Sequence, residues 1–298
     1  MPKDGNLQSK IEYAFSIQPE RFRAYAFSDT ESVSANDLET AVEKYKETGF
    51  VVLDINNVTD LHSLPPHTIL QTIGGIFDLG PLYTPKQYSA KEREQFYKKG
   101  VNKIVAGDTK LHSNFYSASN QKIHADGTLD PFNAVRTAML YCVKPAIEGG
   151  ENSVFNLVGA LFDLHKENPK LAEALFQRDA LTKFSPSNPS LDEVTDSAFA
   201  FDAEGRIISR YSDSEEYCRW SNDPLVQEAL KFMRERLISS DEPKRNVEFK
   251  LLSGQILIMA NNQVAHSRKA FVQSDNNERE MWRALFAKDL TALSLEAY

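Results

Sequence analysis

Two histidines in this sequence are each followed, two positions later, by an acidic residue: His124–Asp126 and His165–Glu167. Imidazole and carboxylate groups together can bind a divalent metal ion. The triplet alone is weak evidence, because 6 His and 42 Asp or Glu in 298 residues make about one such triplet expected by chance. The local structure around each pair must therefore decide which one can bind a metal.

The two pairs differ in the secondary structure that their neighbours predict. His165 lies in a helical pattern over 157–167, where side chains two positions apart point about 200° away from each other. His165 and Glu167 therefore cannot share an ion, and we expect both on a solvated helix surface. His124 and Asp126 lie in an extended stretch just before Gly127, and side chains two apart on a strand point to the same face. We expect this pair to share an ion.

Two protein ligands are too few for a stable metal site, so a third must come from elsewhere. His266 is the best candidate, because it directly follows a strand and turn over 255–265. The other histidines, His62, His67 and His112, lie in loop or helical context without such a partner. Two histidines and one carboxylate with open coordination positions are typical of non-haem Fe(II) oxygenases. The alternative is that His124 and His266 are ordinary residues at the end of a barrel.

Arg279 and Arg283 lie on one face of a predicted strand that has large apolar side chains on both faces. A buried arginine needs an anion, because burying an unpaired charge costs free energy. A dicarboxylate such as 2-oxoglutarate would explain one arginine, since its keto-acid end binds the metal and its distal carboxylate needs a bidentate cation. The other arginine could hold a substrate acid or the metal-side carboxylate. Alternatively, both pair with internal Asp or Glu.

Taken together and in chain order, five segments make the sequence resemble the taurine dioxygenase / clavaminate synthase superfamily of Fe(II)- and 2-oxoglutarate-dependent oxygenases. They are ETGFVVLDI (47–55), IHADG (123–127), VKPAIEGGENSVFN (143–156), LLSGQILIMANNQVAHSRKAF (251–271) and REMWR (279–283). The resemblance spans roughly residues 36 to 290. It implies that Fe(II) and 2-oxoglutarate are the cofactors and that O2 is the cosubstrate.

The resemblance also implies a role for each residue of the site. His124, Asp126 and His266 would bind iron, Arg279 would hold the distal carboxylate of 2-oxoglutarate, and Arg283 would lie near the iron-side carboxylate or the substrate. A threonine that usually contacts the cosubstrate is missing, and Asn152 or Ser153 would replace it. Asn261 and Asn262 stand where the family has an acidic residue before the distal histidine. Family halogenases have a small residue at the position of Asp126, so its carboxylate implies hydroxylation or another hydrogen abstraction.

The predicted activity is oxidation of an unactivated C–H bond in a small carboxylate-bearing molecule, an amino acid or a natural-product intermediate. Hydroxylation is the first expectation, and desaturation or oxidative cyclisation stays open. Arg283, Arg136 and Tyr211 are the candidate substrate residues, although an arginine such as Arg136 is more often a salt-bridged strand residue. The segment 185–222 is a lid or a plain surface insertion. Two rival classes are a zinc-dependent hydrolase or lyase and a non-catalytic jelly-roll binding protein.

Composition narrows the class of partner. The net charge is −8 with a pI near 5.4 and no block of Lys or Arg, which argues against a nucleic-acid partner. The polar start and the lack of a long apolar run predict neither a signal peptide nor a membrane partner. Cys142 and Cys218 have no metal-type spacing and are expected to be reduced, buried thiols. These features predict a cytoplasmic enzyme for a small molecule, and leave a homo-oligomer possible.

The elements that must position these residues predict an α+β fold with a double-stranded β-helix (jelly-roll) core and flanking helices. We expect a single catalytic domain over 1–298, in which a mainly helical part (1–100) packs on a jelly-roll core at about 101–290. Expected helices are 34–49, 67–77, 90–99, one capped by Asn156, 169–176 and 223–238, while 1–33 is irregular. Expected strands are 50–55, 135–143, 247–251, 255–258 and 281–287, with a hairpin over 199–211 and a surface loop over 185–197.

Overall fold

The largest element of the fold is a seven-stranded sheet. The computed structural model describes residues 6–18, 31–88, 97–98, 100–106, 117–127, 129–186, 188–272 and 278–291. The strand order in this sheet is β1-β2-β15-β6-β18-β4-β3, and β1 and β2 are parallel while the other neighbours are antiparallel. The strands are β1 (Val33–Ser34), β2 (Phe50–Asp54), β3 (Tyr97–Lys98), β4 (Val101–Val105), β6 (Thr137–Lys144), β15 (Gln255–Ala260) and β18 (Glu280–Phe286).

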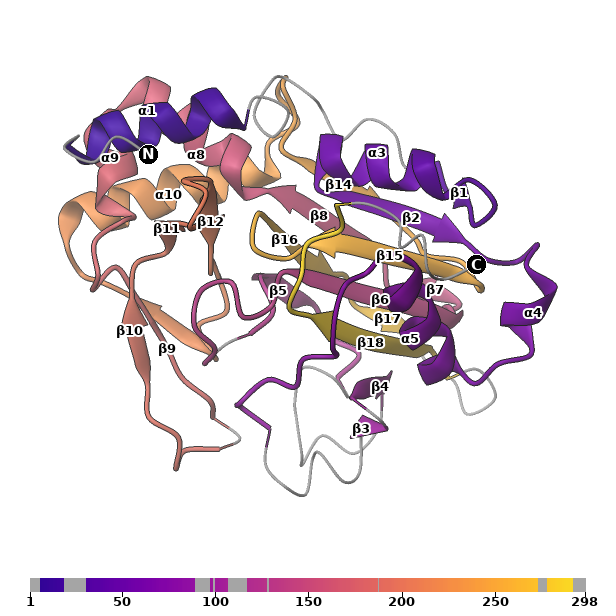
Figure 1. The fold of residues 1–298 in the computed structure, drawn as a ribbon. Coiled ribbons are helices and arrows are strands. Elements are labelled where there is room, and N and C mark those ends of the chain that lie inside the picture. Colours follow the sequence, from indigo (N-terminus) through magenta and orange to yellow (C-terminus); the bar gives the residue numbers. More distant parts are fainter. Residues whose placement is uncertain are drawn as a thin grey trace.

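A second, four-stranded sheet packs against the inner face of the first (Figure 1). Its order is β14-β8-β16-β5, with β5 (Gln121–His124), β8 (Asn152–Asn156), β14 (Asn246–Phe249) and β16 (Val264–Arg268). Val52 and Met259 of the large sheet share one hydrophobic cluster with Val154 and Val247 of the small one. The two sheets therefore form two layers around a common core.

Alternation along the strands decides which side chains enter that core. In β2, Val52 packs between the sheets, while Val51 packs on the outer face of the large sheet. In β18, Met281 packs inward and Trp282 outward, which agrees with the predicted strand and its large apolar side chains on both faces. The outer face is covered by α3 (Leu38–Thr48) and α5 (Pro66–Ile76), and the short helix α4 (Thr59–His62) precedes α5 (Figure 1). The mixed α and β composition agrees with the predicted class.

A helical region lies beside the two sheets, on the left in Figure 1. It contains α1 (Leu7–Ile17), α8 (Leu157–Glu167), α9 (Pro169–Ala174) and α10 (Pro224–Ile238). Its strands are the hairpin β11 (Phe199–Phe201) and β12 (Ile207–Ser209) and the sheet β10 (Val194–Asp196), β9 (Leu181–Lys183) and β13 (Cys218–Trp220). A small pair, β7 (Glu148–Gly149) and β17 (Phe271–Val272), lies near the sheets. Helices and strands of this region share one hydrophobic cluster.

Two N-terminal predictions were wrong. Residues 1–33 were expected to be irregular, but α1 is a helix whose cap, Asn6, accepts a hydrogen bond from Ser9 N at 2.9 Å. Burial of Ile11 and Phe15 against other helices stabilises a segment whose own periodicity is weak. The helix expected from residue 34 begins at Leu38, because the carboxylate of Asp37 accepts from Thr40 N at 3.2 Å and caps it.

Three further predictions need correction. The helix expected over 90–99 is wrong at 97–98, which form β3, and its other residues lie outside the described part of the chain. His165 is not solvated but buried, with its ring 5.6 Å from the ring of Phe15, because α1 covers that face of α8. The surface loop expected over 185–197 ends in a strand, β10, which pairs with β9.

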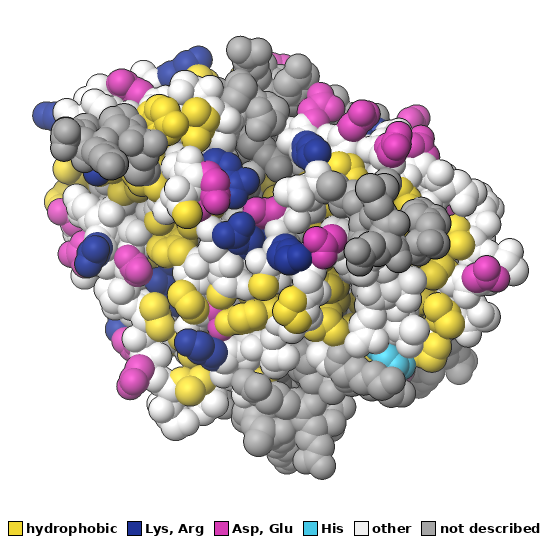
Figure 2. All heavy atoms as spheres, viewed as in Figure 1, with side chains coloured by type: hydrophobic (Ala, Val, Ile, Leu, Met, Phe, Trp, Pro, Cys, Tyr) yellow, Lys and Arg dark blue, Asp and Glu magenta, His cyan; other side chains and the backbone are white. Residues whose placement is uncertain are grey.

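The surface has a mixed charge. On the face shown in Figure 2, Lys and Arg side chains alternate with Asp and Glu and form no continuous basic stripe among the residues drawn in colour. In the described part of the chain, no helix has both the length and the apolar character needed to cross a membrane.

Candidate metal centre

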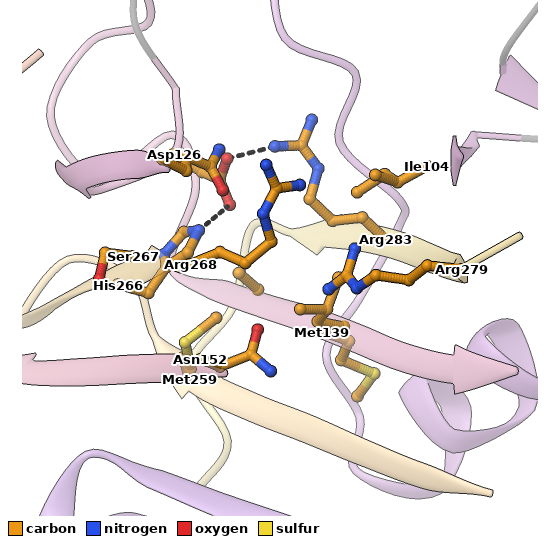
Figure 3. Close-up of a pocket in the computed structure, with 13 residues that line it drawn as sticks. Ile104, Asp126, Met139, Asn152, Met259, His266, Ser267, Arg268, Arg279 and Arg283 are labelled. Carbon is orange, nitrogen blue, oxygen red and sulfur yellow. Dashed lines mark hydrogen bonds and ion pairs between the residues drawn. The ribbon is translucent and has the colours of Figure 1, made fainter. Parts of the chain in front are cut away.

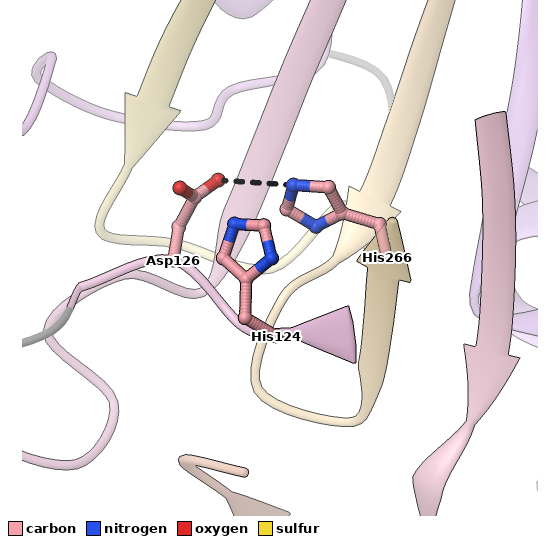
Figure 4. Close-up of side chains that lie close together, drawn as sticks. All are labelled: His124, Asp126 and His266. Carbon is pink, nitrogen blue, oxygen red and sulfur yellow. Dashed lines mark ion pairs between the residues drawn. The ribbon is translucent and has the colours of Figure 1, made fainter. Parts of the chain in front are cut away.

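His124, Asp126 and His266 lie together at one end of the small sheet (Figure 4). His124 ends β5, His266 lies in β16, and the two are direct partners in the antiparallel ladder. Asp126 follows β5 by two residues. One ligand atom from each of the three residues lies within 4.8 Å of the others, which is close enough for a single ion. The structure thus brings together the three residues that the sequence singled out, and keeps His165 and Glu167 elsewhere, on α8.

The backbone around Asp126 is held by the turn that precedes β16. Asn261 Oδ1 accepts a hydrogen bond from Asp126 N at 2.7 Å, and Asn261 Nδ2 donates to Asp126 O at 3.2 Å and to Val135 O at 3.1 Å. Ala125 N donates to Tyr211 O at 3.0 Å on the other side. An aspartate at position 261 could not donate these bonds, which gives a physical reason for the asparagine here.

Both histidines are set to offer a neutral ring nitrogen. His124 Nδ1 lies 2.8 Å from Lys122 O, so Nδ1 carries the proton and Nε2 keeps its lone pair for a metal. Burial lowers the pKa of His124, and burial together with the nearby His124 lowers the pKa of His266 to about 3. Neutral imidazole is the form that binds metal ions.

The two carboxylate oxygens of Asp126 have different surroundings. Oδ1 forms a salt bridge with Arg283, while Oδ2 lies 4.0 Å from His266 Nε2 and has no hydrogen-bond partner among the described residues. Burial alone would raise the pKa of Asp126, but Arg283 and the two histidines outweigh it and hold the pKa below its usual range. A buried, ionised oxygen without a partner is available as a metal ligand, so the donor set fits Fe(II).

A cavity opens beside the triad (Figure 3). Three arginines, Arg268, Arg279 and Arg283, line it together with Asp126 and His266. Its apolar walls are Ile104, Ala138, Met139, Leu140 and Met259. An apolar cavity with a few convergent charged groups is the usual form of a small-ligand site.

Arg279 is buried in this cavity and faces the ring of Phe271, 5.2 Å from its centroid, while Arg268 lies 4.8 Å from the same ring. Burial lowers the pKa of both arginines, to about 10 in each case, so both stay charged at neutral pH. No described carboxylate contributes to either pKa. The alternative that Arg279 pairs with an internal acid therefore finds no support among the described residues. Arg268 and Arg279 can together receive an anion.

Of the two residues expected to replace the missing threonine, Asn152 lines the cavity and Ser153 does not. Asn152 lies opposite Arg268 in the β8–β16 ladder, and its Nδ2 has no hydrogen-bond partner among the described residues. Side chains alternate along β8, so Ser153 points away when Asn152 points in. The structure thus separates two candidates that the sequence left equal.

The three candidate substrate residues are not brought together. Arg283 binds Asp126 and also donates to Tyr88 Oη, so its described contacts are with protein groups. Arg136 lies 3.2 Å from Asp289, and it is not among the cavity residues, which agrees with the salt-bridge alternative. Tyr211 is fully buried in the core of the helical region, with its ring 5.4 Å from that of Trp220. The lid expected over 185–222 is therefore, around Tyr211, part of that core.

Sequence reasoning gave no role to Arg268 or to Asn261. The signal for Arg268 was its position two residues after His266 on a strand, because this spacing puts the two side chains on the same face. No local signal could have indicated the role of Asn261, because its partners, Asp126 and Val135, are far away in the sequence.

Comparison with known proteins gives consistent matches. The family model for "Taurine catabolism dioxygenase TauD, TfdA family" matches residues 16–285. A uridine-5'-phosphate dioxygenase of Amycolatopsis sp is 30% identical over 252 residues, which are 83% of this chain and 88% of the relative. A second uridine-5'-phosphate dioxygenase, of Streptomyces sp, is 29% identical and spans 70% of this chain and 75% of its own length.

Solved structures match the fold. An asparagine oxygenase superposes with a TM-score of 0.59 at 15% identity, and the match covers 95% of this chain and 92% of that one. A taurine dioxygenase of Burkholderia xenovorans superposes with a TM-score of 0.58 at 14% identity, over 87% and 84% of the two chains. At these identities the likeness is one of fold.

Proposed function

Because the chain belongs to the taurine catabolism dioxygenase TauD, TfdA family, we propose that it uses Fe(II), 2-oxoglutarate and O2 to oxidise a C–H bond of a nucleoside 5′-phosphate or a closely similar phosphate ester. The observation that carries the proposal is the buried cluster of His124, Asp126 and His266 beside a cavity lined by arginines. Since the family is one of dioxygenases, the rival classes of zinc hydrolase or lyase and of non-catalytic binding protein are set aside.

In this proposal His124, Asp126 and His266 hold the iron, which with 2-oxoglutarate supplies the activation of O2 when bound. Arg283 keeps Asp126 ionised and oriented, so that Oδ2 faces the two histidines. The hydrogen bond from His124 Nδ1 to Lys122 O sets the ring for coordination through Nε2. The two facing sheets would be the double-stranded β-helix that the sequence predicted.

The cavity would hold the cosubstrate. Arg279 supplies a planar, bidentate cation for the distal carboxylate, and Arg268 and Asn152 add donors to the same region. The apolar walls, such as Met139 and Met259, would exclude water from the bound molecule. This assigns Arg279 the role that the resemblance implied and chooses Asn152 over Ser153.

The substrate class rests on the relatives of 30% and 29% identity, both named for uridine-5'-phosphate. The sequence predicted a carboxylate-bearing molecule, so the two hypotheses agree on an anionic group and differ in its kind. Hydroxylation is the proposed reaction, with desaturation or cyclisation as the alternative outcomes.

The test is an anaerobic titration followed by turnover. Fe(II) and 2-oxoglutarate together should give a visible charge-transfer band, and uridine-5'-phosphate should trigger succinate release in air. Uridine and a set of amino acids serve as comparison substrates, and product mass distinguishes a gain of oxygen from a loss of two hydrogens. Succinate release with an amino acid but not with any phosphate ester would refute the proposed substrate class.

A further inference from the structure

Two buried cations, Lys183 and Arg210, lie next to each other outside the cavity. The two residues are 1% and 6% exposed. Lys183 ends β9 and lies opposite Val194 in β10, and Arg210 Nη2 donates to Val194 O at 3.2 Å. Burial is the largest influence that lowers the pKa of Lys183, and the positive charge of Arg210 is the next largest.

The pair lies beside the metal centre, on the side of His124. Lys183 is opposite Cys218 in the β9–β13 ladder, so the two side chains share a face. Cys218 Sγ donates to Ser212 O at 3.3 Å, and Ser212 forms a β-bridge with His124. Neither Lys183 nor Arg210 lines the cavity that holds Arg279, so the pair is a different site.

Electrostatics agrees with this placement. Burial is the largest influence on the pKa of His124, and the charge of Lys183 adds to its lowering. The same charge helps to lower the pKa of Asp126. The guanidinium carbon of Arg210 is 5.9 Å from the ring centroid of Phe132, in the segment that follows His124 and Asp126.

The charges of the pair are only partly compensated among the described residues. The carboxylates that act on Lys183 are Asp126, which is engaged by Arg283, and Asp130, whose Oδ1 accepts from Tyr83 Oη at 2.6 Å. Asp196 attracts the charge of Arg210, and its Oδ1 accepts from Ser197 N at 2.8 Å. Neither cation forms a salt bridge with a described carboxylate within 4.0 Å, and Arg210 Nε has no hydrogen-bond partner there. Two adjacent buried cations cost free energy unless an anion joins them.

We propose that Lys183 and Arg210 form a receptor for the phosphate of the substrate, on the His124 side of the metal centre and apart from the arginines of the cosubstrate cavity. The inference rests on the proposed function, since it assigns a place to the phosphate of that substrate. A phosphate monoester is close to a dianion at neutral pH, and it matches two cations where a carboxylate matches one. Arginine supplies a planar fork for two phosphate oxygens and lysine a point charge.

The experiment measures binding to the Fe(II)- and 2-oxoglutarate-loaded protein under anaerobic conditions. Uridine-5'-phosphate, uridine and inorganic phosphate are titrated separately by calorimetry. For Lys183→Met and Arg210→Lys we expect about 10- to 100-fold weaker binding of uridine-5'-phosphate, the usual effect of losing a charged hydrogen bond, with unchanged binding of uridine. Lys170→Met, which removes an exposed lysine on α9, is the matched control and should bind like wild type.

The outcomes separate this inference from the proposed function. If uridine-5'-phosphate is no substrate, inorganic phosphate should still bind wild type and fail to bind Lys183→Met, which upholds the receptor and rejects the nucleotide. If both folded variants bind uridine-5'-phosphate and inorganic phosphate like wild type, or wild type binds neither, the receptor is refuted. An equal loss of uridine and uridine-5'-phosphate binding would also refute it, because that result indicates a general structural role.

Discussion

His124 and His266 face each other directly across the β5–β16 ladder, with ring centroids 4.4 Å apart. Asp126 completes the group from the loop after β5, with Oδ2 4.0 Å from His266 Nε2. An ion held by these three residues would therefore connect one edge of the small sheet to the following loop. Several measurable properties should depend on that connection.

The first prediction concerns metal-linked stability. Anaerobic Fe(II) should raise the melting temperature of the metal-free protein, because a ligand that binds only the folded state adds about 2.7 kcal/mol at 100 times its Kd. Asp126→Ala should abolish this rise, since it removes the free ligand oxygen. The measurement is calorimetric melting with and without metal, and an unchanged rise in Asp126→Ala would contradict the proposed ligand set.

A second prediction concerns Arg283, which binds Asp126 and Tyr88. Arg283→Met should weaken metal binding about 10- to 100-fold, the usual effect of losing a partner of a metal ligand. Metal titration with a competing chelator measures this. If Arg283→Met kept wild-type metal affinity but lost substrate binding, Arg283 would instead be the substrate contact that the sequence suggested.

The third prediction separates Asn261 from its neighbour Asn262. Asn261→Ala should lower the free energy of unfolding by about 1–3 kcal/mol, because it leaves buried backbone groups without partners, and it should also weaken metal binding. Asn262 Nδ2 donates to Asn133 Oδ1 at 2.8 Å instead of to the backbone of Asp126. Asn262→Ala is thus the control, with a stability loss in urea but normal metal affinity. Equal metal affinity in both variants would show that the clamp on Asp126 is unimportant.

Arg279 provides the fourth prediction. Arg279→Met should raise the Kd for 2-oxoglutarate about 10- to 100-fold, because the distal carboxylate loses its charged partner. The charge-transfer titration of the Fe(II)-loaded protein reports this Kd without turnover. Arg136→Met is a suitable control, since Arg136 pairs with Asp289 away from the cavity. A normal Kd in Arg279→Met would place the cosubstrate elsewhere.

The fifth prediction is a pH dependence of stability from Lys183. Burial and the charge of Arg210 lower the pKa of Lys183 to about 7 in the folded protein. Cys218, Asp126 and Asp130 act in the opposite direction and raise it. Between pH 10.5 and about 7 the unfolded chain therefore binds a proton that the folded chain does not, which destabilises the folded state as the pH falls. Lys183→Met removes this effect and should be more stable than wild type by about 4 kcal/mol at pH 7, since each unit of pKa shift corresponds to about 1.4 kcal/mol.

That stability difference should shrink as the pH rises and vanish above 10.5, where the unfolded chain also loses the proton. Urea unfolding of both proteins at pH 7 and pH 9.5 measures it. A variant that is less stable than wild type at pH 7 would mean that the lysine has a structural role, whereas a gain in stability with a loss of phosphate binding agrees with a ligand-binding role.

Local sequence patterns were sufficient where neighbouring residues decide the conformation. Asn156 and Asp223 cap α8 and α10 as predicted, because a cap bonds to backbone groups only two or three residues away. The faces of β18 followed from alternation alone. Patterns were insufficient where distant segments decide, as for α1, whose buried face is defined by other helices, and for His165, which α1 covers.

The sequence by itself predicted the chemistry of the centre: the ligand types in His124-Ala-Asp126, the family and the expected cofactors. Only the tertiary structure decided that Asn152 rather than Ser153 lines the cavity, that Arg283 binds Asp126, and that Lys183 and Arg210 meet beside His124. The physical reason is that ligand type and strand alternation are local properties. Ion pairing and burial depend on which distant strands the folded chain brings side by side.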